Sequence, residues 1–263
     1  MSRRDWIAGA GIIAGTALTS AMAPAWAKSA ARPSKPHDVG RKFFADGRVM
    51  PFAGNTIICH LPQQGEGSEA FRAMLDIYRQ LPAMPFARKM TALPPSSYHM
   101  TVIGGANDKD RRRPLWPAGV PLDASMQACN DFVGDTLRAV TLGDDAAPYR
   151  MKVNLAEPAA DEEPLTIRLL PADADTATKL YRLRRRLAER MGIGIESPDD
   201  YGFHMTMGYA IDWLTTSENQ AFRATLAEWK AELARRAPVI TFGAPEYCLL
   251  DDMFHFARQF YLR

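Results

Sequence analysis

One tripeptide occurs twice in this chain of 263 residues, and its residue types could carry out acid-base chemistry. The copies are His99-Met100-Thr101 and His204-Met205-Thr206, and each lies in a short apolar segment that is typical of a β-strand. Successive side chains of a strand point to opposite faces, so each histidine should share a face with its threonine while the methionine points the other way. Each strand would then offer an imidazole and a hydroxyl side by side.

Two such strands facing one cleft would suit displacement at phosphorus. The unperturbed pKa of histidine lies nearest neutrality, so one imidazole can act as a base while the other acts as an acid. One would take a proton from the attacking oxygen, and the other would give a proton to the leaving oxygen. The hydroxyls of Thr101 and Thr206 could donate hydrogen bonds to the nonbridging phosphoryl oxygens. This chemistry needs no metal ion, and the chain has no G-x-S-x-G or phosphate-loop motif.

Strands and helices alternate along the rest of the chain and must position these side chains. Hydrophobic periodicity predicts strands at 55–61, 98–103, 149–155, 165–170, 201–209, 239–250 and 254–262. It predicts helices at 68–81, 122–139, 173–191 and 216–236. The last two strands should form a hairpin that turns at Asp251-Asp252. This mixture of adjacent strands and crossovers predicts an α+β fold with helices outside.

Three segments carry a family resemblance, namely 54–62, 97–102 and 201–206. With their two His-x-Thr motifs they resemble the 2H phosphoesterase superfamily, which includes 2′-5′ RNA ligase-like proteins and cyclic phosphodiesterases, and within it the bacterial DUF1868 family. The resemblance covers about residues 40–263. It implies a bilobal, pseudo-twofold α+β fold in which antiparallel sheets line a central cleft.

The same resemblance implies an activity and assigns roles to the motif residues. The activity is hydrolysis of a cyclic or linear phosphodiester, of the nucleotide or RNA-end 2′,3′-cyclic phosphate type, without a cofactor. His99 and His204 would be the acid and the base, in an order that the resemblance leaves open. Thr101 and Thr206 would orient the phosphate.

Four further residues are weaker candidates for binding the substrate. Tyr98 and Tyr201 flank the motifs, and Tyr201 could reach the cleft rim and stack on a base, although core packing is the favoured role of both. Lys152 and Arg168 lie on predicted strands and could hold a phosphate, although exposed edge positions explain them equally well.

The first 27 residues resemble a twin-arginine signal. Arg3 and Arg4 precede an uncharged stretch that ends in Ala25-Trp26-Ala27, a site where signal peptidase could cut. We therefore expect export by the Tat translocase to the periplasm, with an uncleaved inner-membrane anchor as the alternative. Residues 28–40 should form a flexible linker, and 41–263 a single bilobal domain.

Other histidines and cysteines are interpreted as structural. An exported protein could hold one disulfide, but the spacing of the cysteines suggests neither a disulfide scaffold nor a metal site. These residues are His60, His255, Cys59, Cys129 and Cys248.

The charge balance limits the class of partner. With 32 basic and 30 acidic residues the formal net charge is +2, which argues against a protein that holds duplex DNA through a basic surface. We expect a monomer that acts on a small phosphodiester, nucleotide or RNA end. The alternative is a non-catalytic periplasmic protein that binds a phosphorylated ligand in the same cleft.

Overall fold

The computed structural model describes residues 32–156, 165–195 and 200–263. Residues 34–263 form one compact unit, which begins within the segment 28–40 that the sequence predicts to be a linker. The predicted signal at 1–27 lies outside the described residues. Within the described ranges, no helix has the length and apolar character needed to cross a membrane.

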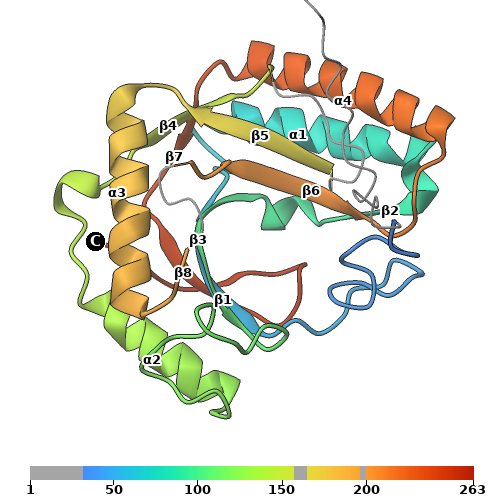
Figure 1. Ribbon diagram of the computed structural model, residues 1–263. Coiled ribbons are helices and arrows are strands. Elements are labelled where there is room, and N and C mark those ends of the chain that lie inside the picture. Colours follow the sequence, from blue (N-terminus) through green and yellow to red (C-terminus); the bar gives the residue numbers. More distant parts are fainter. Residues whose placement is uncertain (1–31, 157–164, 196–199) are drawn as a thin grey trace, which may run out of the picture. The chain divides into compact units, whose positions relative to one another are not determined.

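Two antiparallel sheets form the framework of this unit (Figure 1). The first has the order β3-β1-β8-β9 and consists of β1 (Gly54–His60), β3 (His99–Asn107), β8 (Glu246–Leu250) and β9 (Ala257–Tyr261). The second has the order β2-β6-β5-β4-β7 and consists of β2 (Met90–Ala92), β4 (Tyr149–Val153), β5 (Leu165–Pro171), β6 (His204–Ala210) and β7 (Ile240–Phe242).

Helices cover the two sheets on their outer sides. They are α1 (Glu69–Gln80), α2 (Met126–Arg138), α3 (Ala174–Met191) and α4 (Thr216–Arg236), with short 3₁₀ turns at Leu81–Ala83, Ala87–Lys89, Pro95–Ser97 and Gly143–Asp145. In Figure 1, α1 and α4 lie together beside the second sheet. Helix α2 lies beside the first sheet, and α3 contacts β3 of the first sheet as well as β4 and β5 of the second. The predicted α+β fold with helices outside is therefore confirmed.

Local capping explains where the longer helices begin and end. The Asp173 side chain accepts a hydrogen bond from the backbone N–H of Thr176 and starts α3. Gly192 ends the same helix in the left-handed conformation, with φ of 66°. Thr215 and Glu218 form a reciprocal capping box at the start of α4.

Several predicted boundaries are wrong. The strands predicted at 201–209 and 254–262 begin three residues later, at His204 and Ala257. The helix predicted at 122–139 begins at Met126, because Ser125 accepts the backbone hydrogen bond that caps α2. The strand predicted at 239–250 is two strands in different sheets, since β7 pairs with β4 while β8 pairs with β1. Pro245 lies between them and has no N–H to continue a ladder. The predicted hairpin survives as the β8–β9 pair, whereas β2 was not predicted.

The three cysteines lie in the interior. Cys59, Cys129 and Cys248 are all buried and carry free thiols, as expected for side chains that serve as small apolar groups.

Candidate active site

The expected alternation is present in both motif strands. Met100 and Met205 are fully buried in the core, while His99 and His204 remain partly exposed on the opposite faces. The methionines therefore anchor the two strands and leave the histidine faces available to a ligand.

The two motifs meet at one cavity of about 240 Å³. Strand β3 is the edge of the first sheet and contacts β6 of the second, so the two strands bring their polar faces to the same space. His99, Thr101, His204 and Thr206 all line this cavity. Within the described part of the chain, neither threonine hydroxyl makes a hydrogen bond, so both are available to a ligand.

Both histidines are oriented by the same local hydrogen bond. The Nδ1–H of His99 donates to the carbonyl oxygen of Ser97 at 2.6 Å, and that of His204 donates to the carbonyl oxygen of Gly202 at 2.8 Å. A carbonyl oxygen can only accept, so Nδ1 carries the proton in each ring. Nε2 is then the nitrogen that can exchange a proton with a ligand, and the repeated motif produces the same tautomer twice.

The electrostatic surroundings favour a neutral imidazole at His99. Burial is the main cause that lowers the pKa of His99 from 6.5 to about 4, and the neighbouring His60 and His204 lower it further. The hydrogen bond to Ser97 and the charge of Glu246 act in the opposite direction. Near neutral pH, His99 is therefore unprotonated and able to accept a proton at Nε2.

Two cations at the site were not predicted from the sequence. Arg41 and Lys42 line the cavity, where Arg41 is ion-paired with Asp110 and Lys42 lies 3.1 Å from a carboxylate oxygen of Asp38. Asp110 and Asp38 neutralise part of the positive charge of Arg41 and Lys42. The remaining positive charge would favour an anionic ligand. The sequence feature that could have pointed to them is this pair of adjacent basic residues at the start of the domain.

A tight contact between strands shapes the floor of the cavity. Gly105 lies against Asn55, and a β-carbon at Gly105 would come within 2.0 Å of the Asn55 Oδ1 atom. That oxygen accepts a hydrogen bond from the backbone N–H of Ala106, while Nδ2 of the same residue donates to Asn130. Only glycine lets β3 approach β1 this closely.

The tyrosines predicted to bind substrate are held in packing interactions. Tyr98 is fully buried, so the substrate-binding role predicted for it is wrong, because alternation turns it away from the face of His99. Tyr201 stacks under the guanidinium of Arg184, with 3.6 Å between the Arg184 Cζ and the ring centroid. Its ring centroid lies 6.1 Å from that of His204, so it supports the second motif from the side.

The two predicted cations lie on the second sheet, and neither is among the residues that line the cavity. Arg168 is directly opposite His204 in the β5–β6 register, which places both side chains on the same face. Lys152 is exposed and lies opposite Leu170 on the adjacent strand pair. Arg168 is thus nearer to the motif histidines than Lys152.

One described group of side chains has the types and proximity of a metal site. Ligand atoms of His60, Glu246 and Cys248 lie within 4.8 Å of one another. The Nδ1 atom of His60 is only 2.8 Å from the Glu246 carboxylate, and Arg258 lies 3.5 Å from the same carboxylate. A hydrogen-bonded pair with a nearby cation accounts for this group better than a bound metal ion.

These features define an α+β protein with paired histidines at one cavity. Comparison with known proteins finds one family match and a similar solved structure. Residues 42–162 match the family described as "2H-phosphodiest: Domain of unknown function (DUF1868)". The match supports the resemblance to the 2H phosphoesterase superfamily and suggests a phosphodiesterase-type activity.

A solved structure extends the similarity over more of the chain. The crystal structure of a conserved protein of unknown function from Agrobacterium tumefaciens is similar, with a TM-score of 0.78 and 29% sequence identity. The similarity covers 88% of this chain and 95% of that chain. No curated protein matches the chain.

Proposed function

We propose that this protein is a metal-independent phosphodiesterase that hydrolyses a cyclic or linear phosphodiester, of the nucleotide or RNA-end type, with His99 and His204. The observation that carries the proposal is the pair of like-oriented imidazoles at one cavity, each with Nδ1 bound to a carbonyl oxygen two residues earlier. The phosphodiesterase-type family match supports the same activity.

The surroundings of His99 support the role of base for this histidine. Its neutral Nε2 takes a proton from the attacking water as the new P–O bond forms. His204 then acts as the acid and gives a proton to the leaving oxygen as the old P–O bond breaks. The two protonation states are exchanged in one turnover, and proton exchange with solvent restores them.

The remaining cavity residues would stabilise the negative charge on the phosphoryl group. The hydroxyls of Thr101 and Thr206 donate hydrogen bonds to nonbridging oxygens, whose charge rises in the transition state. Arg41 and Lys42 add positive charge at the cavity wall. These groups would favour a phosphodiester over a neutral ester.

The test uses purified, EDTA-treated protein and a panel of phosphodiesters. The panel contains the four nucleoside 2′,3′-cyclic monophosphates and short RNAs with cyclic-phosphate ends. We expect turnover by the wild type, and a loss of about 100-fold or more in His99→Ala and in His204→Ala. His37→Ala is the matched control, because His37 is an exposed histidine outside the cavity.

The outcomes of this test separate catalysis from binding. Turnover that depends on both histidines and resists EDTA supports the enzyme. Wild-type protein that binds the phosphodiesters without turning them over would instead favour the non-catalytic binding protein. Equal activity in all three alanine variants would contradict a role for the histidine pair.

We also propose export to the periplasm through the twin-arginine pathway. The proposal rests on Arg3-Arg4, the uncharged stretch that follows and the small-x-small site at Ala25-Trp26-Ala27. Cell fractionation should recover the wild-type protein in the periplasm, with its amino terminus at Lys28 by mass spectrometry. A chain with both Arg3→Lys and Arg4→Lys should stay in the cytoplasm. An intact amino terminus in the membrane fraction would favour the uncleaved anchor.

A further inference from the structure

A second and larger cavity lies beside the candidate active site. It has a volume of about 670 Å³ and is lined by His60, Ser96, Glu246, His255, Phe256 and Arg258, among other residues; we call it the arm pocket. Phe256 lines both cavities, so one aromatic side chain is common to their walls. The volume of the active-site cavity is below the usual range for ligand pockets, whereas the volume of the arm pocket lies within that range.

His60 connects the arm pocket to the catalytic histidine. It lies directly opposite His99 in the β1–β3 register, and the two ring centroids are 6.1 Å apart. Cross-strand partners point to the same face of a sheet, so His60 follows His99 along one surface. A ligand at His99 that extended along this surface would reach His60.

The His60 ring is held in one orientation by a buried carboxylate. Its Nδ1 is 2.8 Å from Glu246 Oε2, and its backbone N–H donates to the other carboxylate oxygen at 3.4 Å. Burial alone would raise the pKa of Glu246, but the hydrogen bonds and charge from His60 hold that pKa below its ordinary value. The carboxylate is therefore ionised and accepts from His60 Nδ1–H, which leaves Nε2 for another partner.

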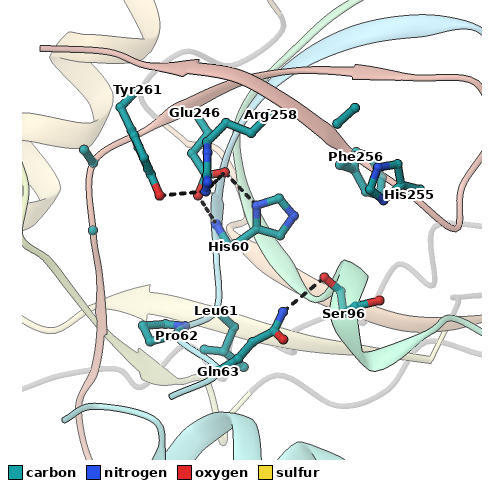
Figure 2. Close-up of a pocket in the computed structure, with 13 residues that line it drawn as sticks. His60, Leu61, Pro62, Gln63, Ser96, Glu246, His255, Phe256, Arg258 and Tyr261 are labelled. Carbon is teal, nitrogen blue, oxygen red and sulfur yellow. Dashed lines mark hydrogen bonds and ion pairs between the residues drawn. The ribbon is translucent and has the colours of Figure 1, made fainter. Parts of the chain in front are cut away.

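Figure 2 shows where that second nitrogen points. Glu246, Arg258 and Tyr261 gather on one side of the His60 ring, while the opposite ring edge faces the side where Phe256 and His255 lie. The hydrogen bond from Arg258 to the Tyr261 hydroxyl, at 2.6 Å, closes the Glu246 side. His60 thus presents a fixed polar atom to a roomy cavity next to the reacting phosphate.

We propose that the arm pocket binds the ester arm that stays on phosphorus, and that this arm is a hydroxyl-bearing sugar or nucleoside. His60 Nε2 makes a hydrogen bond to one of its hydroxyl groups. The inference rests on the proposed function and narrows its substrate class. In that function, water attacks phosphorus from the side of His99, and the leaving oxygen departs toward His204. The retained arm is then the group that can extend past His99 and Phe256.

Two substrates with the same leaving group isolate the retained arm. They are uridine 5′-(4-nitrophenyl) phosphate and methyl 4-nitrophenyl phosphate, which both release 4-nitrophenolate. We expect the wild type to prefer the uridine ester in kcat/KM by at least about tenfold, the ratio that one well-formed hydrogen bond can supply.

Three variants locate the source of this preference. His60→Asn keeps a donor near the Nδ1 position for Glu246 but removes Nε2, so it should raise KM for the uridine ester about tenfold and affect the methyl ester much less. His255→Ala, at an exposed position of the same pocket, should lower kcat/KM for the uridine ester about threefold. His37→Ala should change neither substrate.

The inference and the proposed function can fail separately. Hydrolysis of both esters with no preference and no effect of His60→Asn would overturn the arm pocket while the activity stands. An equal loss on both esters in His60→Asn would also overturn it, because His60 would then act through His99.

If the wild type hydrolyses neither ester, calorimetry with uridine 5′-monophosphate decides the question. Binding that weakens about tenfold in His60→Asn would support the arm pocket without the activity. Absence of binding, or binding that His60→Asn leaves unchanged, would overturn the arm pocket as well.

Discussion

Phe256 packs against the imidazole of His99, with 4.4 Å between the ring centroids and 61° between the ring planes. This contact covers a histidine whose pKa burial lowers to about 4. An aromatic side chain from the segment just before β9 therefore helps to set the protonation state of a residue on β3. This contact allows a direct test of His99 as the proposed base.

We predict that Phe256→Ala shifts the acidic limb of the pH profile upward. The base must be unprotonated, so kcat/KM of the wild type should fall only as the pH drops through about 4. Removing the Phe256 ring admits water to His99, so the pKa of His99 should rise toward 6.5. The pH at which kcat/KM falls should rise with it. The profile is measured with methyl 4-nitrophenyl phosphate, and circular dichroism at each pH confirms folding. A limb that stays in place would show that Phe256 does not shield the base.

We predict that the two motif threonines contribute mainly to kcat. Thr101→Val and Thr206→Val keep the shape of the side chain and remove the hydroxyl that faces the cavity. Each should lower kcat about 10- to 100-fold with a smaller effect on KM, because phosphoryl charge is greatest in the transition state. Thr241→Val, at the exposed position of β7, is the control and should retain full activity. A change in KM alone would indicate a role in ground-state binding.

We predict opposite outcomes at two adjacent glycines. Gly105→Ala would bring a β-carbon within 2.0 Å of Asn55 Oδ1 and should lower the free energy of unfolding by about 2 kcal/mol or more. Gly104→Ala meets nothing within 4 Å and should stay within about 0.5 kcal/mol of the wild type. Urea denaturation measures both. Equal stability of the two variants would refute the close approach of β1 and β3.

We predict that Arg184 is required for stability, although it is a charged residue in the core. Its side chain is 3% exposed, donates to the Val102 carbonyl oxygen and lies over the Tyr201 ring. Arg184→Ala leaves that carbonyl without its donor and opens a cavity, so it should cost about 2–4 kcal/mol. Arg190→Ala, an exposed position on the same helix, should have little effect. Similar melting temperatures for the two variants would contradict this role.

The sequence by itself determined the features that depend on neighbouring residues. Alternation within each motif strand buries Met100 and Met205 and leaves the histidines on the other face, as the residue order predicts. Gly192 ends α3 because a left-handed residue is needed there and glycine adopts it without strain. The α+β class follows from the same local periodicities.

Only the tertiary structure decided which distant segments meet. The β1–β3 register places His60 beside His99, and no spacing along the chain indicates that partnership. Packing likewise brings Arg41 to the cavity and buries Tyr98. Pairing and packing depend on contacts between residues far apart in sequence, whose register a single strand does not specify. The chemistry available to the motif residues was therefore predictable from the sequence. The neighbouring residues that affect the histidines come together only in the folded protein.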